Sequence, residues 1–130
     1  MFDMYMDVIQ VILRELGIGR NYRGYYRTSI AISMALEDEG RLTAVTKEIY
    51  CTTAQQTGCQ WTAVERNIRT VIQRAWKVNP QRLIQMAGYP LTDPPTASEF
   101  IEIVTNYILR TYGPPDGADA LPTPEVPPGS

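Results

Sequence analysis

A chain of 130 residues, of which 44% are hydrophobic and 20% charged, is long enough for one domain with a buried core. Its formal net charge is −2, and the absence of histidine together with only two thiols, Cys51 and Cys59, argues against a catalytic centre or a zinc site. Because no apolar run could span a bilayer and the acidic N-terminus is unlike a signal peptide, we expect a cytoplasmic protein without membrane contact. We also expect that it is not an enzyme and that it has no cofactor, metal or small-molecule substrate.

Hydrophobic periodicity, capping residues and terminating glycines predict an all-α chain without strands. In chain order the predicted helices span 4–16, 22–39, 42–50, 51–57, about 62–77, 79–88 and a last one that begins at 96. The second is apolar on nearly every side between Ile30 and Leu36, which is typical of a buried central helix. Thr43 is expected to cap the third helix, and Gly58 to form the tight turn after the fourth. Asn79 is expected to cap the sixth helix, and Thr96 with Glu99 to form a capping box at the start of the last. We therefore expect a compact bundle of six to seven helices over residues 1–112.

The helix predicted over about 62–77 has an apolar side and a basic side. The apolar side consists of Val64, Ile68, Val71, Ile72 and Ala75. The opposite side consists of Thr62, Ala63, Arg66, Thr70, Gln73 and Lys77. Five basic residues and no acid occur between positions 66 and 82, at Arg66, Arg69, Arg74, Lys77 and Arg82. Thr62 and Glu65 also fit a capping box, which places the start of this helix near residue 62.

A short helix, a turn containing Gly58 and a longer helix with a basic outer face form the layout of a helix-turn-helix. The major groove of DNA admits one α-helix, whose exposed face near its N-terminus meets the base edges. Arginine is best suited to a bidentate contact with guanine, Gln73 to adenine or a phosphate, and Lys77 to the DNA backbone. Taken alone, the same pattern is also typical of a solvated surface helix or of a protein-interaction surface.

The last 18 residues, 113–130, contain six prolines, three glycines, three acids and no base. Such a composition cannot bury enough surface to fold, so we expect a disordered acidic tail after the helical domain. A proline-rich ligand for a partner domain is the alternative interpretation. Without this tail the chain has 12 basic against 11 acidic residues, so the folded part is slightly basic.

Short matches along nearly the whole folded part point to one family. They are, in chain order, Gly24-Tyr25, 31–34, Thr46-Lys47, Tyr50, Val64-Glu65-Arg66, Ile68-Arg69, Ala75-Trp76, Gly88-Tyr89, Pro95-Thr96 and 98–101. In order and spacing these residues resemble the C-terminal effector domain of stage 0 sporulation protein A, the response regulator of sporulation in endospore-forming Firmicutes. The resemblance covers roughly residues 7–110. It implies a six- or seven-helix bundle with a central helix-turn-helix that binds a short asymmetric DNA box, often as tandem copies.

The resemblance also implies which residues contact DNA. Glu65 and Arg66 match DNA-contacting positions of the family, and Thr62 replaces a serine while keeping a hydroxyl. Lys47 and Arg69 match as well and suit phosphate contacts or local pairing. The complete set of expected DNA-binding residues is Thr62, Glu65, Arg66, Arg69, Thr70, Gln73, Lys77 and Lys47.

Three positions depart from the family pattern. Ala63 stands where the family usually has arginine, and Thr70 where it has histidine. Losing a base-reading arginine costs about 1–3 kcal/mol at that base, so we expect a weaker or different target box. Trp61 replaces a small residue or proline and is expected to alter the approach to the DNA backbone. The family's receiver domain is also missing from this sequence, so its phosphorylation control and cation site do not carry over.

Two hypotheses follow. In the first, the chain is a sequence-specific transcription regulator of double-stranded DNA, which acts alone or with further copies of itself in tandem. In the second, it is an interaction protein that has lost DNA specificity and modulates or competes with a full-length relative. Retention of Glu65 and Arg66 favours the first hypothesis, whereas Ala63, Thr70 and the modest overall charge favour the second.

Overall fold

The computed structural model describes residues 2–113, with side chains from Tyr5 onward. Its elements are α1 (Phe2–Glu15), α2 (Tyr25–Glu37), the 3-10 helix η1 (Glu39–Ala44), the π-helical turn η2 (Thr46–Tyr50), α3 (Cys51–Thr57), α4 (Trp61–Val78), α5 (Pro80–Ala87) and α6 (Ala97–Tyr112). The predicted all-α fold is confirmed, since these residues contain no strand. The predicted tail lies, apart from Gly113, outside the described residues.

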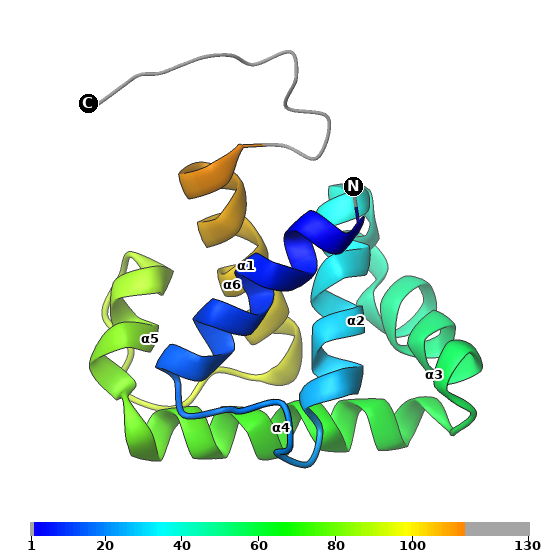
Figure 1. Ribbon diagram of the computed structural model, residues 1–130, viewed down its shortest axis with the longest axis horizontal. Helices are drawn as coiled ribbons and strands as arrows, with labels where there is room; N and C mark the ends of the chain where they lie inside the picture. The colour runs from blue at the N-terminus through cyan, green and yellow to red at the C-terminus, as the bar shows by residue number, and fades with distance from the viewer. Residues whose placement is uncertain (1, 114–130) are drawn as a thin grey trace.

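α4 runs along one side of the molecule, with α3 and α5 at its two ends and α2 and α6 rising from it (Figure 1). This leaves one long side of α4 without a covering element within residues 2–113. Among the same residues, no helix combines the length and the apolar character that a membrane span requires. In the view of Figure 1, α4 therefore forms the lower surface of the bundle, and the other helices lie above it.

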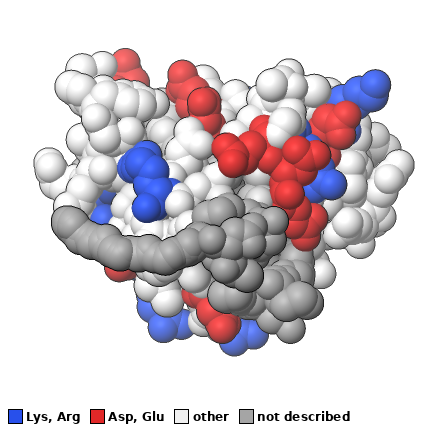
Figure 2. All heavy atoms as spheres, turned by 90° about the horizontal axis from the view of Figure 1, so that it is seen from above, with Lys and Arg blue, Asp and Glu red and all other residues white. Residues whose placement is uncertain are grey.

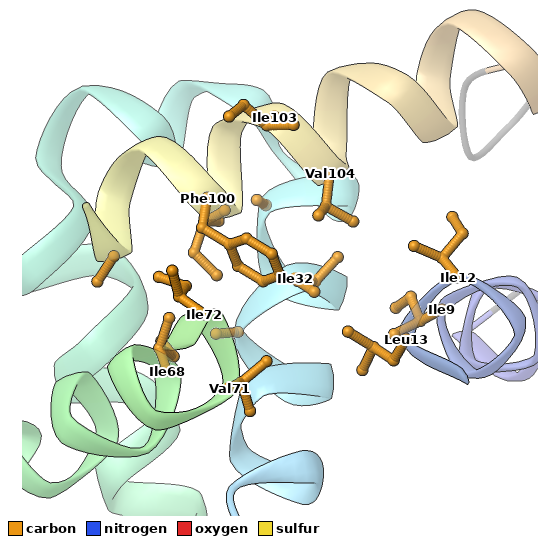
Figure 3. Close-up of a cluster of buried hydrophobic side chains, with 14 of the residues drawn as sticks. Ile9, Ile12, Leu13, Ile32, Ile68, Val71, Ile72, Phe100, Ile103 and Val104 are labelled. Atoms are coloured by element: carbon orange, nitrogen blue, oxygen red, sulfur yellow. The ribbon is translucent and has the colours of Figure 1, made fainter. Parts of the chain in front are cut away.

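The core confirms the central role predicted for α2. Every residue from Ile30 to Leu36 is buried, and α2 packs against α1, α4 and α6. Figure 3 shows isoleucine, leucine, valine and phenylalanine side chains from these four helices meeting in one cluster. Phe100 of α6 lies in it, fully buried, with Ile68 of α4 and Ile9 of α1. Because one cluster holds all four helices, the core fixes α4 on its buried side.

α2 is shorter than the predicted helix over 22–39. It begins at Tyr25 because Gly24 has φ 92°, a left-handed conformation that an α-helix cannot continue through. It ends at Glu37 because Asp38 is extended, and the Asp38 side chain accepts a hydrogen bond from the backbone N–H of Gly40 at 2.9 Å. The acid therefore starts the next turn of 3-10 helix.

The helix predicted over 42–50 with Thr43 as its cap is wrong in both respects. The segment forms η1 followed by η2, and η2 continues into α3 without a break. Asp38 is the residue that caps η1, whereas the Thr43 hydroxyl donates to the Gly40 carbonyl at 2.8 Å. A threonine cap would instead accept a hydrogen bond from a backbone N–H two or three residues later. The first helical arm of the motif is therefore longer than α3 alone.

Capping differs between α4 and α6. The capping box predicted at Thr62 and Glu65 is not formed, because α4 begins one residue earlier and its N-cap, Gln60, makes no side-chain bond. The box predicted at Thr96 and Glu99 is confirmed, with hydrogen bonds of 2.9 and 3.2 Å in the two directions. Such a cap contributes about 1 kcal/mol to stability. α4 therefore begins without a side-chain cap, whereas two side-chain hydrogen bonds hold the start of α6.

Candidate nucleic-acid interface

α3, the turn after it and α4 form the predicted helix-turn-helix. Gly58 ends α3 with φ 69° and ψ 44°, and the N–H of Cys59 bonds to the carbonyl of Ala54 at 3.0 Å. Three residues later the chain is helical again, and α3 packs against α4. The backbone of this turn therefore brings the two helices together at an angle.

Arg27, near the start of α2, braces this motif from behind. Its Nε donates to the Thr57 hydroxyl at 3.1 Å, and its Nη1 donates to the side-chain oxygen of Asn67 at 3.0 Å. One planar guanidinium thus joins the end of α3 to the middle of α4. The bracing role of Arg27 could not be predicted from sequence, because both of its partners lie 30 or more positions away.

The buried side of α4 agrees with the predicted apolar stripe. Its buried residues are Val64, Ile68, Val71, Ile72 and Ala75. Locking this stripe into the core turns the opposite side of the helix outward. The exposed residues on that outer face are Thr62, Arg66, Gln73 and Lys77, while Ala63 and Thr70 are half-buried. We call these six residues the outer face of α4.

The polar side chains of the outer face differ in how free they are. Within residues 2–113, Arg66, Gln73 and Lys77 have no side-chain partner. The Thr70 hydroxyl donates to the Arg66 carbonyl at 3.0 Å, which uses its hydrogen inside the helix. Three long side chains with unused donors therefore follow one another along the helix, and they are available to a ligand.

Glu65 and Arg69 lie beside the outer face and form a loose ion pair with each other. Their closest nitrogen–oxygen distance is 3.8 Å at i,i+4 spacing, and 62% of the Arg69 side chain is exposed. A pair of this kind contributes only about 0.3–0.5 kcal/mol. Either side chain can therefore leave its partner for another contact at little cost. Lys47, the remaining predicted site residue, is exposed on η2 and not on α4.

The basic run between residues 66 and 82 does not form one surface. Arg74 turns back to the bundle, where its Nε donates to the Gly17 carbonyl at 3.2 Å and its guanidinium lies 5.6 Å from the centre of the Tyr22 ring. Arg82 pairs with Glu15 at 2.8 Å and donates to the Tyr107 hydroxyl. Two of the five charges therefore hold the fold together, whereas Arg66, Arg69 and Lys77 remain exposed, Arg69 in a loose pair with Glu65.

Charge is distributed unevenly between the two sides of the molecule. Figure 2 looks onto the side opposite α4, where acidic side chains form the largest visible charged cluster. Glu37, Asp38 and Glu39 are exposed at the upper end of α2, which is the end far from α4. An acidic side opposite a basic one orients a protein toward a polyanion. The uneven charge explains how a chain of net charge −2 can present a cationic face.

A sequence comparison decides the family. The protein-family model described as "Sporulation initiation factor Spo0A C terminal" matches residues 9–108. The chain belongs to this family. Members of the Spo0A C-terminal family are DNA-binding effector domains, so the helix-turn-helix on α3 and α4 belongs to a family with that function.

Within this Spo0A C-terminal domain, the three departures noted from sequence all lie on α4. Ala63 offers no hydrogen-bonding side chain, and the Thr70 hydroxyl is engaged within α4. Trp61 is the first residue of α4, and 39% of its surface is exposed. The start of α4 therefore offers the ring of Trp61 and the methyl group of Ala63, whereas flexible cations follow further along the helix.

Behind Glu65, a pocket of about 360 Å³ opens between η2 and the start of α6. Tyr50 lines it and is 97% buried, since its relative exposure is 3%. Burial, and secondarily the charge of Glu65, raises the pKa of the Tyr50 hydroxyl to about 12, while Arg69 acts in the opposite direction. The neutral phenol is therefore the form that the folded protein stabilises.

Replacing Tyr50 by phenylalanine is expected to make the free energy of unfolding fall less steeply with pH above pH 10. Below pH 10 the hydroxyl is protonated in both states, so the raised pKa has its full stabilising effect there. Between pH 10 and about 12 the unfolded chain releases this proton and the folded chain keeps it, so the wild type loses stability as pH rises. The extra loss is at most roughly 3 kcal/mol.

The measurement is urea unfolding of wild type and Tyr50→Phe at several values between pH 8.5 and pH 12. Tyr112→Phe, which removes a hydroxyl from an exposed ring, is the matched control and should follow the wild-type curve. Parallel curves for Tyr50→Phe and wild type would show that this phenol does not carry the effect.

No cluster of three or more histidine, cysteine, aspartate or glutamate side chains suited to a metal ion occurs within residues 2–113. Cys51 and Cys59 are both free thiols, and both are partly buried.

Proposed function

We propose that the chain is a sequence-specific, DNA-binding transcription regulator whose α4 enters the major groove. The observation that carries this proposal is the outer face of α4, where Arg66, Gln73 and Lys77 are exposed and unpartnered on a helix that the core holds in place. Membership in a family of DNA-binding effector domains supports it. The charge distribution supports it as well, because the acidic cluster seen in Figure 2 lies on the side opposite α4.

Arg66 is the residue that we assign to base reading. It lies in the first two turns of α4, where a recognition helix meets the base edges, and its guanidinium is free to contact guanine bidentately. Gln73 suits a contact with adenine or with a phosphate. Lys77, about three turns beyond Arg66, suits a contact with the DNA backbone. Thr62 and Thr70 contribute hydroxyl oxygens as acceptors, while Glu65, Arg69 and Lys47 adjust the contacts at the edges of this face.

The alternative function is that of a modulator or competitor of a full-length relative. Ala63 and Thr70 favour it, because neither presents a free donor where relatives of this domain read bases. In the alternative, α4 keeps its fold but recognises no particular sequence. In the first proposal, tandem copies on adjacent boxes are natural partners, whereas in the second the partner is another regulator.

A selection from a random double-stranded DNA library, using the purified chain, distinguishes these functions. We expect one motif to be enriched, with affinity that falls steeply as salt rises. Arg66→Ala should weaken binding to this motif about 10- to 100-fold, which corresponds to about 1–3 kcal/mol, and should relax the preference at one base position.

Arg41→Ala is the control, since it removes the same charge beyond the upper end of α2, away from α4. It should leave the enriched motif and its affinity nearly unchanged. Absence of any enriched motif, with Arg66→Ala binding as the wild type does, would contradict sequence-specific regulation and favour the interaction protein.

A further inference from the structure

The loop between α1 and α2 is fastened along the flank of α4. Gly17 has φ 87°, and a Cβ atom there would lie 2.8 Å from a side-chain methyl of Val78. Gly24 has φ 92°, and a Cβ atom there would lie 2.8 Å from the backbone oxygen of Asn67. Two glycines thus let the loop backbone approach α4 at points roughly 16 Å apart along the helix. Figure 1 shows this loop descending to the level of α4.

Between these two contacts the loop is held in one conformation. Arg74 donates to the Gly17 carbonyl at 3.2 Å and lies over the Tyr22 ring. Backbone bonds of 3.0 Å from Tyr22 to Gly19 and from Tyr25 to Tyr22 close two successive turns. The loop therefore runs along α4 as a rigid strip, and one of the basic residues of α4 serves to fix it there.

This strip presents two cationic side chains to solvent, one on each side of the exposed, neutral Asn21. Arg20 and Arg23 are exposed and have no partner within residues 2–113. No acid occurs between Glu15 and Glu37 in the sequence, and the carboxylate of Glu15 is already paired with Arg82. Neither arginine is therefore neutralised by an acidic side chain in the part of the chain that the structure describes.

A polar groove continues this surface toward the helix-turn-helix. It has a volume of about 380 Å³ and lies between the start of α2, the end of α3 and the middle of α4. Its lining residues are Gly24, Tyr26, Arg27, Gln56, Thr57 and Asn67. A third arginine of the same acid-free stretch, Arg27, lines this groove while bracing the motif.

We propose that the 17–24 loop is a second DNA-contacting element, in which Arg20 and Arg23 bind phosphates of one strand that borders the major groove occupied by α4. This inference rests on the proposed function. An α-helix with its side chains is about 10–12 Å wide and the groove about 12 Å, so whatever is fixed to the flank of the helix faces the sugar-phosphate backbone. Guanidinium groups bind phosphate oxygens bidentately, and a pre-ordered loop loses little entropy on binding.

This assignment separates two kinds of contact. Arg66 on the outer face reads a base, whereas Arg20 and Arg23 fix the register of the domain on the duplex and carry no sequence information. Removing the loop charges should therefore weaken binding to every sequence by the same factor. Removing Arg66 should weaken binding mainly to the preferred one.

The test compares the double variant Arg20→Gln/Arg23→Gln with the matched variant Arg41→Gln/Arg110→Gln, which removes two charges at the other end of the bundle. Affinities are measured by fluorescence anisotropy on the selected duplex and on a scrambled duplex, between 50 and 200 mM salt. The loop variant should lower the slope of log affinity against log salt by about 1.8. Its affinity deficit relative to wild type should shrink about tenfold across this range, equally on both duplexes.

Phosphate ethylation interference gives a second readout. One or two phosphates on a single strand should impair wild-type binding when ethylated and make no difference to the loop variant. Circular dichroism and thermal unfolding of both double variants check that each remains folded.

The outcomes are distinguishable. Equal slopes for the loop variant and the matched variant would overturn the loop assignment while leaving DNA binding by α4 in place. A wild-type chain without salt-dependent affinity for either duplex would contradict the proposed function itself. A loop variant that weakens the selected duplex alone would assign Arg20 or Arg23 to base reading and overturn the phosphate role.

Discussion

Replacing Phe100 by alanine is expected to lower the free energy of unfolding by about 3–5 kcal/mol. Phe100 is fully buried at the start of α6, and its ring points into the space between α2 and α4, toward Ile32 and Ile72 (Figure 3). Removing the ring takes away its apolar contacts with α2 and α4. It also leaves a cavity that the surrounding helices close only in part. For a domain of this size, the loss is a large fraction of total stability.

Urea unfolding followed by circular dichroism measures this loss at neutral pH. Phe100→Leu retains most of the volume and should cost clearly less. Tyr112→Ala, which truncates a ring that is 56% exposed near the end of the same helix, should change stability by no more than about 0.5 kcal/mol. A loss below about 1 kcal/mol for Phe100→Ala would show that this ring is not at the centre of the core.

The helices could be predicted from sequence wherever a long apolar period faces one core. α2 is the clearest case, because residues that are apolar on every side have no arrangement except burial. The cap at Asn79 and the capping box at Thr96 were also readable, since each satisfies backbone donors within three residues. Local chemistry decides such features, so a single sequence contains the necessary information.

The segment from 39 to 50 could not be predicted in the same way, although the helix predicted over 51–57 is confirmed as α3. Its choice between α, 3-10 and π geometry follows from Asp38 capping an earlier turn and from packing against α2 and α4. The failed capping box at Thr62 has a related cause, since α4 begins at Trp61 and the Glu65 carboxylate lies near Arg69. Each of these outcomes depends on competition between neighbours that a motif search considers separately.

The orientation of the outer face was predictable, but the identity of its free cations was not. A helical wheel places Arg66 and Lys77 opposite the buried stripe, and the structure has them there. The wheel carries no information about Arg74 and Arg82, whose partners lie 57 and 67 positions away. It also ignores Arg20 and Arg23, which become part of the same surface only because a loop is fixed to α4.

Replacing Gly24 by alanine is expected to destabilise the protein by about 2–4 kcal/mol and to weaken DNA binding as well. Part of the loss comes from the left-handed backbone, which costs an alanine about 1–2 kcal/mol. The rest comes from the new Cβ atom, which would lie 2.8 Å from the backbone oxygen of Asn67 and must push the loop away from α4. Because that movement shifts Arg20 and Arg23, the affinity for any duplex should fall even where the protein is folded.

Two other glycines of the chain separate these effects. Gly88→Ala has the positive φ of 79° without any atom within 4 Å of the new Cβ, so it should cost only about 1–2 kcal/mol and leave DNA affinity unchanged. Gly19→Ala lies in the same loop with neither a positive φ nor a close neighbour, and should be neutral or stabilise by up to about 1 kcal/mol. Unfolding free energies and duplex affinities of the three variants are measured under one condition. Equal losses at Gly24 and Gly88 would show that backbone conformation alone matters, and would remove close packing of the loop on α4 as the link between this glycine and DNA binding.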